Sequence, residues 1–199
     1  VGSEMCIRDS YECALRVLFY LERTIDLGLT FDGNPAELFG MSDSNWETNR
    51  STTGFCFLLA GACISWASLR QVSVALSSCE AEIMAASEGG KEGKFLRNFL
   101  IELGVSSGEP IDLYVDNQAA RDLAYNPEHH KRTKHIDRRH FFVRELVEDQ
   151  ILRVPYVATA ENLADFFTKS LNPVQFIAIR NRIMNVRVSE DSTTTPSSQ

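Results

Sequence analysis

Residues 113–120 read Leu-Tyr-Val-Asp-Asn-Gln-Ala-Ala and combine a short apolar strand with the start of a helix. An apolar run that ends in an aspartate and continues directly into a helical pattern is typical of a strand whose carboxyl end carries a functional side chain. The stretch therefore predicts an α/β arrangement in which Asp116 lies at the edge of a sheet.

Three further carboxylates occupy similar positions along the chain. Asp43 follows an apolar stretch, Glu82 lies early in a long helical pattern, and Asp165 lies in a later segment with helical spacing. Divalent cations such as Mg²⁺ prefer oxygen ligands, and pairs of such ions catalyse phosphodiester chemistry. A lone acidic residue is usually solvated surface, whereas four carboxylates in the order Asp, Glu, Asp, Asp suit a site for two divalent cations.

Hydrophobic periodicity divides the chain into helices and strands. In chain order we expect a helix over 12–27, strands over 37–42, 53–60 and 62–67, a helix over 77–103, a strand over 111–116, helices over 118–125 and 136–147, a strand over 151–157, and helices over 160–169 and 173–184. The connection at Gly61 is short, which predicts an antiparallel hairpin between the second and third strands. This order of elements predicts one layered α/β domain.

Composition limits the class of protein. The chain has 199 residues, 44% of them hydrophobic, which is long enough for one core with extensions. A formal net charge of −7 argues against a generally basic protein that coats nucleic acid. The five cysteines are odd in number and include no Cys-x-x-Cys pair, which favours reduced thiols in an intracellular compartment. No apolar run approaches the roughly 18 residues of a membrane helix, so we expect no membrane association.

The long helix carries two glutamates on different faces. At roughly 100° per residue, Glu82 shares its face with small and apolar residues such as Ala86 and Gly93. Glu80 falls on the opposite side, with Lys91 and Lys94. Because the small face is the one that can lie against a sheet, we expect Glu82 to point inward and Glu80 to be solvated.

Seven short motifs follow one another along the chain in an order that resembles one known family. They are SDSNW (42–46), RSTTGF (50–55), ISW (64–66), VALSSCEAE (74–82), DNQAA (116–120), RTKHID (132–137) and LAD (163–165). Together they resemble the ribonuclease H domain of copia-type LTR retrotransposon polyproteins, over about residues 12–184. Each motif alone is weak, whereas the co-linear set is specific.

The resemblance implies a fold and a domain layout. The fold is ribonuclease H-like, with a five-stranded mixed sheet of three antiparallel and then two parallel strands, flanked by helices. Residues 37–186 would form this domain, and residues 11–36 would be a helix that ends the preceding reverse transcriptase region. Residues 1–10 have neither helical nor strand periodicity, so we expect a non-native leader. Residues 187–199 have nothing to bury, so we expect a disordered tail.

The resemblance also implies a function. It is that of a metal-dependent endoribonuclease that cleaves the RNA strand of RNA–DNA hybrids during reverse transcription. Asp43, Glu82, Asp116 and Asp165 would be both the catalytic residues and the ligands of two Mg²⁺ ions, with Mn²⁺ as the alternative metal. The implied partners are the hybrid and the reverse transcriptase region of the same polyprotein. The implied location is intracellular, in a cytoplasmic virus-like particle or in the nucleus.

A basic segment, residues 129–144, lies between Asp116 and Asp165. It contains all four histidines (His129, His130, His135 and His140) together with Lys131, Arg132, Lys134, Arg138, Arg139 and Arg144. No pair of the histidines has the i, i+4 spacing that a zinc site on a helix requires, so contacts with phosphates are favoured, with a merely solvated helix as the alternative. We assign nucleic-acid contacts to Asn117, Gln118, Lys131, Arg132, Lys134 and His135.

Three other functions compete with the nuclease. Residues 114–117 are similar to the Tyr-x-Asp-Asp motif of polymerases, but that motif needs a second aspartate in a hairpin turn, and here Asn117 precedes a helix. Transposases and integrases of this fold need a late glutamate, and Glu82 is early. A catalytically inactive relative that binds hybrid or supports the polymerase remains the alternative, and retention of all four carboxylates favours the enzyme.

Overall fold

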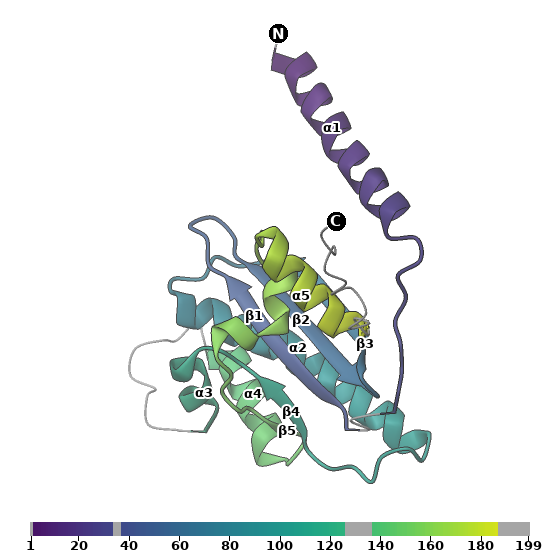
Figure 1. Ribbon diagram of the computed structural model, residues 1–199. Helices are drawn as coiled ribbons and strands as arrows, with labels where there is room; N and C mark the ends of the chain where they lie inside the picture. Colours follow the sequence, from purple (N-terminus) through teal and green to yellow (C-terminus); the bar gives the residue numbers. More distant parts are fainter. Residues whose placement is uncertain (1, 34–36, 126–136, 187–199) are drawn as a thin grey trace, which may run out of the picture.

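A five-stranded mixed sheet forms the centre of the molecule (Figure 1). The computed structural model describes residues 2–33, 37–125 and 137–186. In spatial order the strands are β3 (Ala62–Arg70), β2 (Thr52–Leu59), β1 (Phe39–Asn45), β4 (Ile111–Tyr114) and β5 (Leu152–Arg153). The first three strands are antiparallel, whereas β4 is parallel to β1 and β5 is parallel to β4. The sheet predicted from the resemblance is therefore confirmed.

Helices cover both faces of this sheet (Figure 1). One face carries α2 (Ser78–Glu102), α3 (Gln118–Tyr125) and α4 (Asp137–Glu148). The other face carries the 3₁₀ helices η2 (Thr159–Glu161) and η3 (Leu163–Phe167), followed by α5 (Pro173–Met184). The helix α1 (Gly2–Arg23) projects away from the sheet and its covering helices. None of the helices in the described ranges is long and apolar enough to cross a membrane.

The hydrophobic core lies on both sides of the sheet because β2 contributes side chains to each. Phe55 and Phe57 point toward α2 and α4, where they pack with Leu113 and Leu146. Cys56 points to the other face, and that cluster includes residues of β1, η3 and α5. A strand covered on both faces is apolar throughout, which explains the continuous hydrophobic run in β2.

The hairpin predicted at Gly61 is confirmed. Ala60 and Gly61 both have positive φ, at 53° and 94°, and two such residues in a row match the right-handed twist of the flanking strands. The β1–β2 pairing places Asp43 opposite Gly54. The end of β1 and the part of β2 that contains Gly54 therefore lie side by side.

Several predicted boundaries were wrong. The first helix begins at Gly2 rather than at residue 12 and ends at Arg23. The prediction located this helix by an apolar face with helical spacing. The side chains from residue 7 onward are mostly exposed, so the helix also includes residues that lack this spacing. The predicted α-helix over 160–169 is instead η2 and η3, which are separated by the buried Asn162.

The prediction that Glu80 is solvated was also wrong, because Glu80 is only 4% exposed. The backbone N–H of Glu80 donates to Ser77 Oγ, which caps the start of α2. In return Glu80 Oε2 accepts a hydrogen bond of 2.7 Å from the backbone N–H of Leu76. Glu80 is therefore part of a reciprocal cap, which satisfies a donor in the turn before the helix.

We predict that Glu80→Gln lowers the free energy of unfolding by about 1 kcal/mol, because an amide oxygen is a weaker acceptor than a carboxylate. Chemical denaturation measures the change. Glu102→Gln is the control, since Glu102 is an exposed acidic residue in the last turn of the same helix, and its loss should not destabilise the protein. Equal stabilities of the two variants would contradict the capping role.

Candidate metal centre

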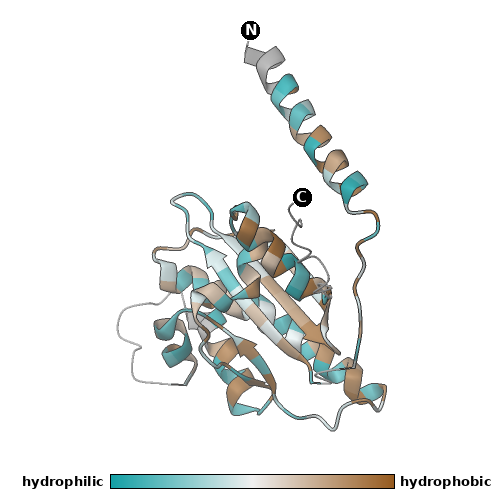
Figure 2. Ribbon diagram, in the orientation of Figure 1, coloured by the Kyte–Doolittle hydropathy of each residue, from teal (hydrophilic) through white to brown (hydrophobic). Residues whose placement is uncertain are grey.

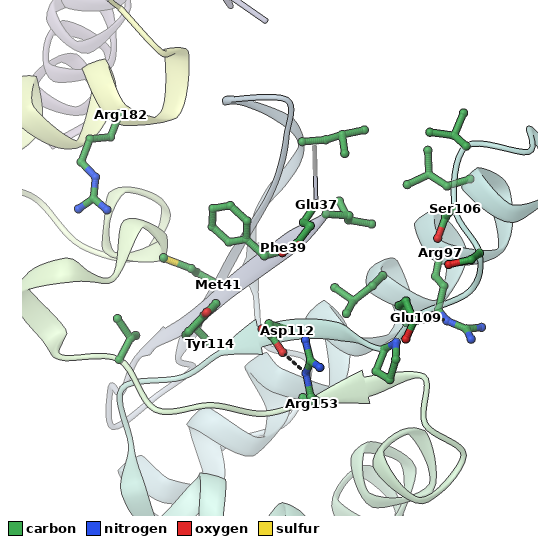
Figure 3. Close-up of a pocket in the computed structure, with 18 of the residues that line it drawn as sticks. Glu37, Phe39, Met41, Arg97, Ser106, Glu109, Asp112, Tyr114, Arg153 and Arg182 are labelled. Atoms are coloured by element: carbon green, nitrogen blue, oxygen red, sulfur yellow. Dashed lines mark hydrogen bonds and ion pairs between the residues drawn. The ribbon is translucent and has the colours of Figure 1, made fainter. Parts of the chain in front are cut away.

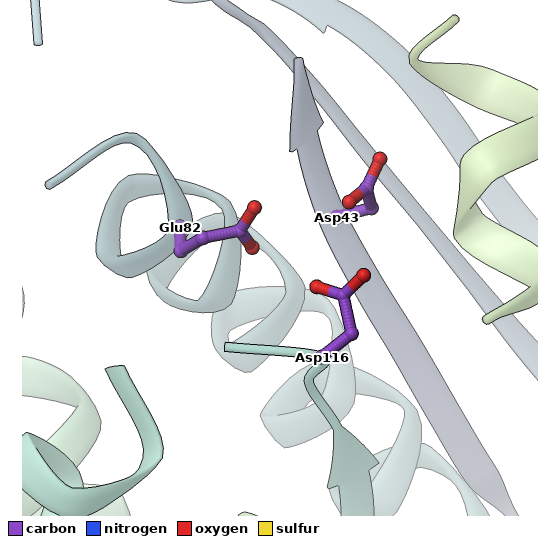
Figure 4. Close-up of side chains that lie close together, drawn as sticks. All are labelled: Asp43, Glu82 and Asp116. Carbon is purple, nitrogen blue, oxygen red and sulfur yellow. The ribbon is translucent and has the colours of Figure 1, made fainter. Parts of the chain in front are cut away.

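Three of the four predicted carboxylates meet at one end of the sheet (Figure 4). Asp43 lies near the end of β1, Asp116 follows β4, and Glu82 lies in the second turn of α2. One carboxylate oxygen from each of the three lies within 4.8 Å of the others. Since β1 and β4 are adjacent and parallel, their carboxyl ends lie at the same edge, which brings the two aspartates together.

Burial makes this cluster electrostatically unfavourable without a cation. Glu82 is 6% exposed, and burial raises its pKa to about 8, helped by the charges of Asp43 and Asp116. Burial also raises the pKa of Asp43 and the pKa of Asp116 above their usual value. The cluster therefore favours either protons or a bound cation.

A hydroxyl group orients each of the three carboxylates. Ser44 donates to Glu82 Oε1 from both its backbone N–H and its hydroxyl, at 3.2 and 2.9 Å. The hydroxyl of Thr168 donates to Asp43 Oδ2, and the side chain of Thr159 lies near enough to Asp116 to lower the pKa of that carboxyl. Sequence reasoning missed these three hydroxyls, because serines and threonines are common and nothing local distinguishes them.

Asp165 lies beside the cluster, on η3. It is 7% exposed, its Oδ1 lies 2.7 Å from Lys169 Nζ, and its charge and a hydrogen bond both raise the pKa of Asp43. The structure thus places all four predicted carboxylates in one region, with Asp165 adjacent to Asp43 and outside the set of three whose oxygens converge.

The close approach of η3 to β2 depends on a glycine. A Cβ atom on Gly54 would lie 2.6 Å from Thr168 Cγ2 and 3.0 Å from the backbone oxygen of Ala164. Any side chain at this position would push η3 outward. Since Gly54 pairs with Asp43, its missing side chain leaves the space through which Thr168 reaches that carboxylate.

The residues assigned to nucleic-acid contact are described only in part. Asn117 Oδ1 accepts a hydrogen bond of 3.0 Å from the backbone N–H of Ala120 and so caps α3. Gln118 is exposed at the start of that helix, next to Asp116. The other four lie outside the described residues: Lys131, Arg132, Lys134 and His135.

A cavity lies elsewhere, against residues of β1 and β4 (Figure 3). Its volume is about 730 Å³, and it includes Phe39, Tyr114 and the ion pair of Arg153 with Asp112, 2.5 Å apart. None of the four carboxylates lines it. The arginines and acidic residues that line this cavity largely balance in charge, whereas the carboxylate cluster concentrates negative charge, so we place the candidate site at the carboxylates.

The carboxylate cluster fits a divalent cation. All its donors are carboxylate oxygens, which Mg²⁺ and Mn²⁺ prefer. Glu82 Oε2 is buried and has no hydrogen-bond partner among the described residues, which is costly unless a ligand satisfies it. Asp43, Glu82 and Asp116, with Asp165 beside them, are therefore the residues that could hold such an ion.

Sequence comparison relates the chain to transposon proteins. No family model matches it. The retrovirus-related Pol polyprotein from transposon TNT 1-94 of Nicotiana tabacum is 42% identical over 166 residues, which is 81% of this chain. The corresponding polyprotein from transposon RE2 of Arabidopsis thaliana is 36% identical over 185 residues, or 90% of this chain. The chain spans only 12% and 13% of these two relatives.

Among solved structures, similarity is found to the N-terminal RNase H domain of Rv2228c from Mycobacterium tuberculosis, solved as a fusion with maltose binding protein. The TM-score is 0.48 at 10% sequence identity, and the match covers 73% of this chain and 97% of that chain.

The raised pKa of Glu82 predicts how stability depends on pH in metal-free protein. Between pH 4.5 and about 8 the folded protein retains a proton on Glu82 that the unfolded chain has released, so stability falls as pH rises through this window. Glu82→Gln removes the contribution of Glu82 to this dependence. The variant should melt at a higher temperature than the parent at pH 8 and at a similar temperature near pH 4.5. Parallel melting profiles in EDTA would contradict the assignment.

Proposed function

Because the chain is homologous to a segment of the retrovirus-related Pol polyproteins of plant transposons, we propose that it is a metal-dependent endoribonuclease that cleaves the RNA strand of RNA–DNA hybrids. The homology confirms the resemblance to copia-type polyproteins that the seven motifs indicated. The sheet has the strand order and directions that this resemblance implied. The proposed setting of the reaction is reverse transcription of the element.

The observation that carries the proposal is the convergence of Asp43, Glu82 and Asp116, with one buried oxygen of Glu82 left unpaired. These three residues and Asp165 would hold two Mg²⁺ ions, or Mn²⁺ in their place. When bound, such ions activate a water molecule and stabilise the leaving oxygen of a phosphodiester. The protein's own contribution is positioning, since the hydroxyls of Ser44 and Thr168 restrict the carboxylates before any ion arrives.

The proposed partners follow from the same family. The hybrid would contact Asn117, Gln118 and the basic segment, and the reverse transcriptase region of the polyprotein would contact the first helix. Exposed apolar side chains on α1, among them Leu18 and Phe19, support the second contact. Figure 2 shows hydrophobic as well as hydrophilic residues along this helix. The proposed location, a cytoplasmic virus-like particle or the nucleus, rests on the resemblance alone.

We predict that Asp116→Asn lowers Mg²⁺-dependent hybrid cleavage by more than the roughly 10- to 100-fold that losing a partner of a metal ligand costs. The fold should be retained, with an unchanged circular dichroism spectrum. The metal-free melting temperature should be equal or higher, since one of several clustered charges is removed.

Asp112→Asn is the matched control, because Asp112 lies on the same strand but lines the distant cavity. That variant should cleave like the parent. If Asp116→Asn cleaves nearly as fast as the parent, Asp116 does not belong to the site. If the folded parent does not cleave, the result favours the inactive hybrid-binding alternative.

The basic segment is tested by its salt dependence. Each lost phosphate contact lowers the slope of log affinity against log salt by somewhat under about one unit. We therefore predict that replacing Lys131, Arg132 and Lys134 with Ala weakens hybrid binding at low salt and flattens this slope. The titration is made in the Asp116→Asn background, which prevents cleavage. Replacing Lys91 and Lys94, exposed on α2, is the control, and equal slopes for both variants would place the hybrid elsewhere.

A further inference from the structure

The ammonium group of Lys169 lies among the carboxylates of the candidate metal centre. Lys169 Nζ is 2.7 Å from Asp165 Oδ1, and the two side chains are 36% and 10% exposed. A pair on the surface of α2 lies nearer to water. The pair of Lys91 with Glu88, at 2.8 Å, has side-chain exposures of 55% and 32%. The Lys169 pair is therefore less screened by solvent than such a surface pair.

The charge of Lys169 acts on more than its nearest partner. It lowers the pKa of Asp43 and the pKa of Asp116, against the larger effect of burial on both. Burial in turn opposes the charge on Lys169, yet its ion pair with Asp165 and the charges of Asp43 and Asp116 raise the pKa of its ammonium group. Lys169 therefore carries its charge at neutral pH and offsets part of the negative charge of the cluster.

A single turn holds this ammonium in place. Asp165, Thr168 and Lys169 lie at i, i+3 and i+4 at the end of η3, and the backbone N–H groups of Thr168 and Lys169 both donate to the carbonyl of Asp165, at 3.3 Å. The same turn carries the Thr168 hydroxyl that binds Asp43. The close contact of this turn with Gly54 fixes the position of the turn. The backbone of this turn therefore places Lys169 beside Asp165, and the pairing does not depend on the flexible side chain alone.

We propose that Lys169 is the built-in counter-ion of this centre: it pairs with Asp165 and stabilises the metal-free carboxylates, and a divalent cation displaces its ammonium group from Asp165 on binding. The proposal rests on the proposed metal site. It makes the ammonium and the divalent cation competitors for the same negative charge. Lys169 is a positioning residue in this scheme, because it acts on the carboxylates and not on the substrate.

The proposal predicts two opposite effects of Lys169→Gln. The metal-free variant should melt at a lower temperature than the parent, because the carboxylates lose their counter-ion. Mg²⁺ should bind at least about fivefold more tightly, which is the lower end of typical couplings between two ligands. Calorimetric titration with Mg²⁺ and thermal melts in EDTA measure both. Lys91→Gln is the control for loss of a lysine from an ion pair, and Lys169→Arg, which keeps the charge, should bind Mg²⁺ like the parent.

A second measurement uses the parent chain and does not depend on any variant folding. Limited acetylation followed by mass spectrometry should show Lys169 protected in EDTA and more reactive in saturating Mg²⁺, with Lys91 unchanged. Unchanged Lys169 reactivity, or Mg²⁺ affinity of Lys169→Gln equal to or weaker than that of Lys91→Gln, would overturn the counter-ion role while leaving the metal site intact. A folded parent that binds no Mg²⁺ would instead overturn the proposed metal site itself.

Discussion

The rest of this structure depends on one constraint: carboxylates of like charge are held close together in a buried site. Oxygens of Asp43, Glu82 and Asp116 converge within 4.8 Å, and burial makes their ionised forms unfavourable. Left to themselves, such side chains would turn toward solvent or take up protons. The fold prevents the first outcome because each carboxylate is attached to a different, well-packed element and is hydrogen-bonded in place. Under the proposed function, a divalent cation would take the place of these protons.

The packing around α2 shows how this constraint is met. The helix turns a face of alanines and glycines toward the sheet, so that Ala85 is fully buried and Gly93 lies against the ring of Phe57. Small side chains allow a short distance between helix and sheet, and that distance brings the Glu82 carboxylate to the ends of β1 and β4. The buried cap of Glu80 fixes where the helix begins, and with it the rotation of Glu82 about the helix axis. Stability and site geometry therefore depend on the same contacts.

Sequence patterns were sufficient for those parts of the molecule that depend on local periodicity. The positions of most strands and helices along the chain and the inward position of Glu82 follow from repeats of two or of about 3.6 residues, and the hairpin follows from the short turn at Gly61. The directions of the strands were instead implied by the resemblance of the seven motifs. Contacts between distant segments carry no such signal. Asn162 donates to the backbone oxygen of Ser42 across 120 positions, at 3.0 Å, and its Oδ1 accepts from Ala164. These bonds interrupt the helix that periodicity predicted over 160–169.

That interruption gives the centre a closed side and an open side. Asn162 and Thr168 hold η3 against β1, and Asp43 beneath it is only 3% exposed. Asp116 is more exposed than Asp43 and Glu82, and it is followed directly by Asn117 and the exposed Gln118. In the proposed reaction, a phosphodiester would therefore reach the cluster from the side of Asp116 and the start of α3. The chain continues from α3 into the basic segment, so the residues assigned to phosphate contact follow in sequence from the open side of the centre.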